Sequence, residues 1–175
     1  MVCELLAPAG SVEAFRAAVE NGADAVYLSG KAFGARAYAP NFSDEELTEA
    51  VRYAHLRNVK VYVTVNTLVD DSEMRLLQEY LRFLYECEID AVLVQDLGVA
   101  AVARTCVPNL PLHASTQMTV HNAAGVRFLR ELGFTRVVVS REMSLAELQQ
   151  CVQEGGAEIE AFVHGALCIS YSGQC

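Results

Sequence analysis

Short runs of almost entirely apolar residues recur along the chain and alternate with longer amphipathic stretches. Runs such as VYVTV and VVV have no polar face, which is typical of parallel strands that are covered on both sides. The pattern therefore predicts seven buried strands, within residues 3–10, 25–30, 59–66, 91–96, 111–116, 136–142 and 159–165.

The stretches between these runs have apolar residues at three- and four-residue spacing, which predicts amphipathic helices. Ser43 with Glu46, and Ser144 with Glu147, have the spacing of a capping box and mark two helix starts. A shorter helix is expected to stop at Pro108, since proline cannot continue it. The predicted helices cover residues 11–22, 43–58, 71–90, 98–109, 122–133 and 144–156.

The regular alternation of strand and helix predicts a parallel sheet with right-handed crossovers. A closed eight-stranded barrel typically needs about 250 residues, and this chain has 175. An open doubly wound sheet is the rival, but APAGSVEAF after the first strand lacks a glycine-rich dinucleotide fingerprint. We therefore expect an α/β fold: a parallel (β/α) TIM-like barrel, incomplete, with about seven strand–helix units and the last unit missing. Residues 1–175 are expected to form this single domain.

Composition and charge narrow the possible partners. The formal net charge is -9, and such a surface repels nucleic acid unless basic residues cluster locally. No apolar run approaches the ~20 residues of a membrane span. The start, MVCELLAPAG, lacks the basic region of a secretory signal. We therefore expect a cytoplasmic protein with reduced thiols and no membrane partner.

The predicted strand ends carry amides, acids, a guanidinium and imidazoles. In a parallel barrel these ends meet on one rim, where the functional residues lie. Strand ends are also polar simply because they reach solvent, but so varied a set favours a site. We predict substrate binding by His113 and Ser115. We predict catalytic roles for Asn66, Asp96, Gln117, Arg141, Glu142 and His164.

Two other charged residues are candidates, each with a structural alternative. Glu4 lies within the first strand, where a lone buried charge is costly. It either pairs with a cation such as Arg141 or has a catalytic role. Arg36 lies in the long loop 30–46 and could bind a carboxylate or phosphate bidentately, or it is a solvated loop arginine.

The tail EAFVHGALCISYSGQC holds Cys168 and Cys175, and His164 precedes the first of them by four residues. Three chemistries could use it. Cys168 could be a nucleophile with His164 as its base, or the thiols could bind zinc or an iron–sulfur cluster, each of which needs four ligands. Cys3 is expected at the opposite end of the barrel, so either metal site is incomplete in this chain.

The tail fits the pattern E-x-F-x-x-G-A-x-C-x-x-x-x-G-x-C, from Glu160 to Cys175. This pattern resembles the signature of the collagenase-like peptidase family, number thirty-two among peptidases of unknown catalytic type. The resemblance covers essentially the whole chain. Weaker agreements are LAPAG at 6–10, Arg36 before Asn41 and Phe42, VNTL at 65–68, VQDLG at 94–98, HASTQ at 113–117 and SREMSL at 140–145.

The resemblance implies a function that the residues alone do not specify. The family is named for proteolysis, but several bacterial members support hydroxylation of a tRNA wobble uridine, a ribosomal RNA cytidine or a ubiquinone precursor. Those members hold a four-iron four-sulfur cluster on four cysteines. The resemblance therefore implies that Cys168 and Cys175 are two metal ligands, with the other two beyond residue 175. It also implies that this chain is an amino-terminal fragment of a longer member.

Iron–sulfur-dependent hydroxylation of an RNA base is the expected function, and two alternatives stay open. One is a peptidase that uses the His164–Cys168 region, although no H-E-x-x-H motif and no nucleophile elbow is present. The other is a non-catalytic, incomplete barrel that acts in a complex. The expected partners are RNA or a small aromatic or peptide substrate, with self-association through the open barrel edge. Because this chain has two of the four ligands, the alternative is that this chain alone binds no cluster.

Overall fold

The computed structural model describes residues 3–35, 40–165 and 169–174. Its strands form one parallel sheet in which each strand pairs with its neighbours in sequence, in the order β1 to β7. The sheet curls into a half-barrel, so the predicted incomplete α/β barrel is confirmed. The strands are β1 (Leu6–Ala9), β2 (Ala25–Leu28), β3 (Lys60–Val65), β4 (Ala91–Val94), β5 (Leu112–Ala114), β6 (Arg136–Val138) and β7 (Glu158–Glu160).

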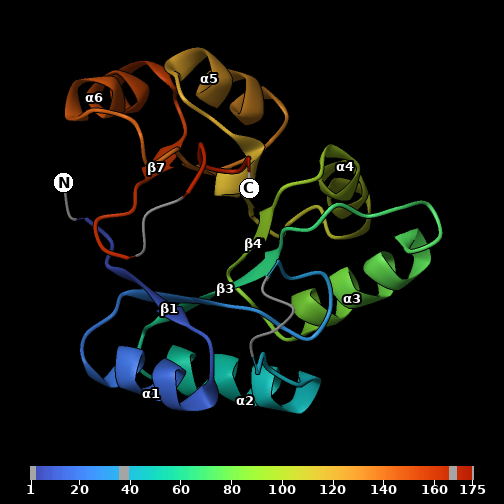
Figure 1. The fold of residues 1–175 in the computed structure, drawn as a ribbon. Coiled ribbons are helices and arrows are strands. Elements are labelled where there is room, and N and C mark those ends of the chain that lie inside the picture. The colour runs from blue at the N-terminus through green and yellow to red at the C-terminus, as the bar shows by residue number, and fades with distance from the viewer. Residues whose placement is uncertain (1–2, 36–39, 166–168, 175) are drawn as a thin grey trace.

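Helices alternate with the strands and cover the outer face of the curved sheet (Figure 1). The pairs α1–α2, α3–α4 and α5–α6 lie on three sides of it, and α6 and α1 flank the side where, in the described part of the chain, β7 and β1 do not pair with each other. The helices are α1 (Val12–Glu20), α2 (Asp44–His55), α3 (Met74–Glu86), α4 (Leu97–Cys106), α5 (Ala123–Glu131) and α6 (Leu145–Glu154), with a short 3-10 helix, η1 (Thr116–Met118), after β5.

Local signals explain where the helices begin. Both predicted capping boxes are present, with Ser43 and Ser144 each exchanging hydrogen bonds with the glutamate three residues on. Asp96 caps α4 by accepting from the backbone N–H groups of Gly98 and Val99. Helix α4 ends at Cys106, two residues before Pro108, as expected. No helix in the described parts of the chain is both long and apolar enough to cross a bilayer.

Apolar side chains fill both faces of the sheet. The larger cluster packs the strands against the helices, and it includes the fully buried Val63, Leu81 and Val94. A smaller cluster lies on the concave face, where Tyr62 and Leu93 pack with Ala25, Ala91 and Val138. Because neighbouring residues of a strand point to opposite faces, strands buried on both faces read as continuous apolar runs.

Below this inner cluster, at the amino end of the strands, Glu4 is bound by three donors. It accepts from the guanidinium of Arg136 at 2.6 Å, the hydroxyl of Tyr62 at 2.9 Å and the ammonium of Lys60 at 3.1 Å. Partial burial alone would raise the pKa of Glu4, but these hydrogen bonds outweigh it and hold the pKa at about 2. The sequence suggested Arg141 as the partner; the partner is Arg136, because Glu4 precedes β1 and lies at the opposite end from the rim.

Arg136 also binds β7. Its Nε and Nη2 donate to Glu158 at 2.9 and 2.7 Å, and its Nη1 lies 3.7 Å from Glu160. Its side chain is only 10% exposed. Within the described residues no strand pairing joins β7 to β1. The pair of Glu4 and Arg136 therefore connects the chain before β1 to the last strands by charge.

Replacing Arg136 with methionine is expected to destabilise the fold strongly. The change leaves the carboxylates of Glu4, Glu158 and Glu160 without their shared cation, and breaking a buried ion pair from one side costs about 3–5 kcal/mol. Urea unfolding followed by circular dichroism measures the change in the free energy of unfolding.

Arg127→Met is the matched control. Arg127 is 48% exposed and lies 3.5 Å from one carboxylate, Glu154. The loss at such a surface pair is expected to stay below about 1 kcal/mol. Equal losses for the two variants would contradict a supporting role for Arg136.

Candidate active site

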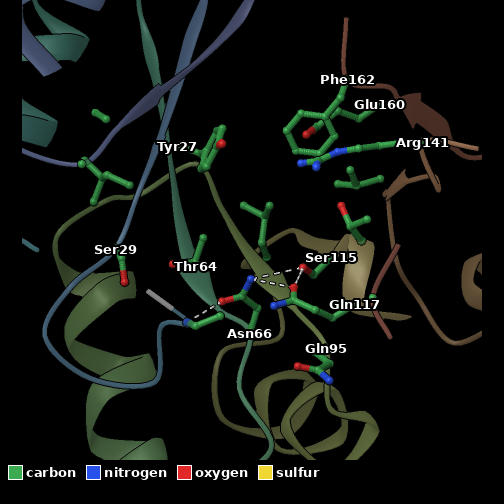
Figure 2. A pocket seen from close by; sticks show the side chains of 18 of the residues that line it. Tyr27, Ser29, Thr64, Asn66, Gln95, Ser115, Gln117, Arg141, Glu160 and Phe162 are labelled. Atoms are coloured by element: carbon green, nitrogen blue, oxygen red, sulfur yellow. Dashed lines mark hydrogen bonds between the residues drawn. The ribbon is translucent and has the colours of Figure 1, made fainter. Parts of the chain in front are cut away.

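A cavity of about 420 Å³ opens at the carboxyl end of the strands. This is the end at which parallel barrels bind their substrates. The walls combine aromatic rings with amides, hydroxyls and the guanidinium of Arg141 (Figure 2). Its polar and aromatic lining residues are Tyr27, Ser29, Asn41, Thr64, Asn66, Gln95, Ser115, Thr116, Gln117, Arg141, Glu160 and Phe162.

Asn66 is the centre of a hydrogen-bond network in the cavity wall (Figure 2). Its Nδ2 donates to Ser115 Oγ at 3.2 Å and to Gln117 Oε1 at 2.9 Å, and its Oδ1 accepts from the backbone of Ala35 at 3.1 Å. Ser115 Oγ also donates to Gln117 Oε1. Both bonds to Gln117 end on its oxygen, which fixes the amide and directs its two N–H donors elsewhere. The network thus joins the ends of β3 and β5 to the loop after β2. It brings Asn66, Ser115 and Gln117 together, as the sequence predicted.

The opposite wall carries a cation stacked on an aromatic ring. The guanidinium carbon of Arg141 lies 4.1 Å from the centre of the Phe162 ring, a contact that favours a flat, fixed guanidinium. Figure 2 shows Glu160 beside this pair. Arg141 comes from the loop after β6, and Phe162 and Glu160 come from β7 and the residues after it. A planar ligand could therefore stack on this wall and meet amide groups on the other.

Glu160 is the acid with the most perturbed ionisation in the cavity. Burial raises its pKa to about 7, helped by the nearby carboxylate of Glu4 and opposed by Arg136. Its Oε2 is buried without a hydrogen-bond partner. Arg136 already binds two other carboxylates, so it cannot fully compensate a third charge. Glu160 therefore carries a proton over much of the range below neutral pH, and the cavity wall includes a neutral carboxyl group there.

Of the predicted site residues that the structure describes, five do not line the cavity, and Asp96 and His113 are two of them. Asp96 caps α4 and also accepts from the backbone of Val69 at 3.3 Å, so its carboxylate supports two loops. His113 is 5% exposed and packs edge-on against Tyr62 with 4.7 Å between ring centres. Burial lowers the pKa of His113 to about 3, and Arg136 adds to the effect, which leaves the ring neutral.

The other predicted residues are spread over both ends of the barrel. Glu4 belongs to the ion cluster at the amino end, and Glu142 binds the backbone of Ser172 at 2.8 Å rather than lining the cavity. His164 is exposed on the strand-seven loop. The remaining predictions, Arg36, Cys168 and Cys175, lie outside the described residues. In the described ranges, no three histidine, cysteine, aspartate or glutamate side chains gather as a metal site.

Several lining residues were not predicted as site residues. Glu160 and Phe162 appeared only as letters of the tail pattern, and Tyr27 and Thr64 only inside predicted strands. The available signal was the alternation along a strand: Glu158, Glu160 and Phe162 are two residues apart and so share one face. Reading that face toward the barrel interior would have placed Glu160 in the cavity.

Comparison with known proteins identifies the family. The model of peptidase family U32 matches residues 10–175. The chain belongs to peptidase family U32. Among solved structures, a U32 peptidase superposes with a TM-score of 0.76 at 16% identity, covering 91% of this chain and 68% of that one. At that identity the likeness supports the fold alone.

Curated relatives of this U32 chain differ in their described roles. The tRNA hydroxylation protein P1 of Bacillus subtilis is 41% identical, and the 23S rRNA 5-hydroxycytidine synthase of Escherichia coli is 42% identical. The collagenase of Porphyromonas gingivalis is 33% identical. Each match covers 98% of this chain. The chain spans 41%, 26% and 44% of these relatives, respectively, and therefore less than half of each.

Glu160→Gln is expected to stabilise the chain at pH 8 and to have little effect at pH 5. The folded state holds a proton on Glu160 between its ordinary pKa of 4.5 and about 7. Its contribution to stability is therefore present at low pH and lost as the pH rises through 7. Glutamine resembles the protonated form, so the gain at pH 8 is about 2–3 kcal/mol. Urea unfolding at the two pH values measures it.

Glu158→Gln serves as the matched control, because Glu158 is 67% exposed and paired with Arg136. That variant removes a favourable ion pair and is expected to gain nothing at pH 8. A Glu160→Gln chain that is equally destabilised at both pH values would mean that Glu160 is ionised throughout.

Proposed function

We propose that this U32 chain forms the base-binding part of an enzyme that hydroxylates a pyrimidine in RNA. The observation that carries the proposal is the cavity at the carboxyl rim, whose Phe162 and Glu160 belong to the tail pattern. Support comes from relatives at 41% and 42% identity that are described as acting in hydroxylation of tRNA and of 23S rRNA.

The cavity has the size and chemistry for one extruded base. Enzymes that modify a base take it out of the stack, hold it between aromatic or apolar groups and read its edge by hydrogen bonds. A volume of about 420 Å³ lies within the usual range of small-molecule sites. Phe162 with Arg141 supplies a stacking wall, and the amides of Gln95 and Gln117 supply donors and acceptors for the polar edge of a pyrimidine.

The cofactor proposed is an iron–sulfur cluster that has Cys168 and Cys175 among its thiolate ligands. Thiolates are the ligands such clusters require, and four are needed. Two would therefore come from outside the tail, and the relatives have more than twice the length of this chain. A bound cluster would supply one-electron redox chemistry at the rim. The residues of this chain would orient the base and shield it from water.

The acidic composition supports phosphate contacts outside this chain. A net charge of -9 opposes binding of a polyanion unless basic residues cluster. We propose that most of the affinity for RNA comes from a region of the whole protein that corresponds to the part of the relatives outside this chain. The cavity then contributes recognition of one base rather than attraction of the strand.

A peptidase is the second candidate, because one relative is described as a collagenase. The described residues hold one chain of groups that resembles a hydrolytic triad: Ser140 Oγ lies 3.3 Å from Nδ1 of His121, whose Nε2 lies 3.6 Å from Glu142. However, Ser140 is 2% exposed and does not line the cavity. A nucleophile must reach a substrate carbonyl. The three groups therefore favour a structural role over hydrolysis.

Loss of the gene for the whole protein is expected to remove one hydroxylated pyrimidine from cellular RNA. Complementation with the wild-type gene is expected to restore a nucleoside heavier by one oxygen atom, measured by mass spectrometry of digested tRNA and rRNA. Cys168→Ser and Phe162→Ala are expected to fail, the first through loss of a cofactor ligand and the second through loss of base stacking.

Cys106→Ser is the matched control, because Cys106 is a free cysteine on α4, away from the cavity. It is expected to restore the modification fully. Full restoration by Cys168→Ser would refute the cofactor, and an unchanged set of nucleosides in the deletion strain would refute the hydroxylase. Cleavage of gelatin by the purified whole protein, lost in Cys168→Ser, would favour the peptidase instead.

A further inference from the structure

The chain between the two tail cysteines is fastened to the barrel rim by a buried serine. Ser172 is fully buried although its neighbours Tyr171 and Gln174 are exposed. Its backbone N–H and its hydroxyl both donate to Glu142 Oε1, at 2.8 and 3.1 Å. The same hydroxyl accepts from the backbone N–H of Arg141 at 3.1 Å. The loop after β6 and the tail are thus joined through one carboxylate oxygen.

The next residues of the tail fit closely against η1 and the turn after it. Gly173 has a φ of +86°, and a Cβ there would lie 2.6 Å from Thr119 Oγ1 and 2.7 Å from the carbonyl oxygen of Thr116. Both the backbone conformation and the close approach therefore require glycine. Gln174 Nε2 adds a hydrogen bond of 2.8 Å to Thr119 Oγ1. The tail is consequently held on two sides, by the loop after β6 and by the turn after β5.

The second oxygen of Glu142 faces a histidine. His121 Nε2 lies 3.6 Å from Glu142 Oε2, and the ring of His121 meets Tyr171 edge-on with 6.1 Å between ring centres. Hydrogen bonds from Ser172 and backbone N–H groups lower the pKa of Glu142 despite the opposing effect of desolvation, so it is ionised at neutral pH. Both oxygens are directed at protein groups, which does not suit a group that must exchange a proton with substrate.

We propose that Glu142 is a positioning residue that clamps the segment Ile169–Gln174 to the rim and thereby orders the chain between Cys168 and Cys175 before any cofactor binds. The inference rests on the proposed function for the role of those thiols as ligands. Gly173 lines the cavity together with Gln117, so the clamp also joins the cysteine segment to the substrate wall. Ordering the segment in advance lowers the entropic cost of binding across both thiols.

Binding of phenylarsine oxide tests the clamp, because this reagent bridges two thiols that are held close together. The purified 175-residue chain is titrated as wild type, Glu142→Ala and Glu142→Gln, with Cys168→Ala as the blank for the remaining cysteines. Glu142→Ala is expected to bind about tenfold more weakly, since one or two residues must then be ordered on binding. Glutamine keeps an oxygen that accepts from Ser172, so Glu142→Gln is expected to bind like wild type.

Glu131→Ala is the matched control, an exposed glutamate at the end of α5, and it is expected to leave binding unchanged. Amide hydrogen exchange at Ser172 gives a second readout: exchange is expected to accelerate in Glu142→Ala and to stay slow in Glu142→Gln. A wild-type affinity in Glu142→Ala would overturn the proposal. So would equal losses in the alanine and glutamine variants, which would assign Glu142 a role that needs its charge.

These measurements use neither iron nor RNA, so they separate the clamp from the proposed function. An intact clamp in a protein whose deletion leaves the set of RNA nucleosides unchanged would refute the hydroxylase and keep the positioning role. A hydroxylase whose arsenical binding ignores Glu142 would refute the clamp alone.

Discussion

The curled sheet depends on the guanidinium of Arg136. It reaches Glu4, 132 positions away in sequence, and two acids on β7. Neighbouring strands are otherwise joined by ladders of backbone hydrogen bonds, and these ladders alone permit many curvatures. The ion pair between Glu4 and Arg136 ties the chain before β1 to β6. The distance across the cavity at the other end follows from that curvature.

The same guanidinium also affects an acid that lines the cavity. Arg136 binds Glu4 and Glu158 directly, and Glu160 lies farther away at 3.7 Å. Of these acids, Glu160 is the one that lines the cavity. Burial raises the pKa of Glu160 and Arg136 opposes that rise, so an interaction that supports the base of the barrel also affects the ionisation of an acid in the cavity. On the short strand β7, Glu158 thus pairs with Arg136, and Glu160 lines the cavity.

The sequence predicted what depends on local chemistry. Apolar runs and capping boxes located the strands and helix starts. Strand ends predicted that Asn66, Ser115 and Gln117 lie together, because parallel strands bring their carboxyl ends together. Asp96 shows the limit of that reasoning. A carboxylate after a strand serves equally well as a ligand or as a helix cap, and only the neighbouring N–H groups of Gly98 and Val99 distinguish the two.

Long-range geometry was beyond the pattern of residues. The partner of Glu4 depends on how far the sheet curls, which no spacing in the sequence encodes, and so Arg136 read only as the first residue of a strand. Glu160 was not predicted to line the cavity for a related reason. A polar residue on a terminal strand reads as an exposed edge position until the inner face of the barrel is known.

The outer edges of β1 and β7 pair with no strand among the described residues, and they differ in what they can accept. Just before β1, the backbone carbonyl of Leu5 accepts hydrogen bonds from β2 and the residue before it. Because backbone groups alternate in direction along a strand, those of Pro8 face the free edge, and proline has no N–H to donate there. On β7, the backbone groups of Glu158 and Glu160 bond toward β6. The backbone groups of Ile159, which lies between these two acids, therefore face the free edge. A second copy of β7 would bring like charges together. We therefore expect these edges to accept a neutral or basic strand more readily than an identical one.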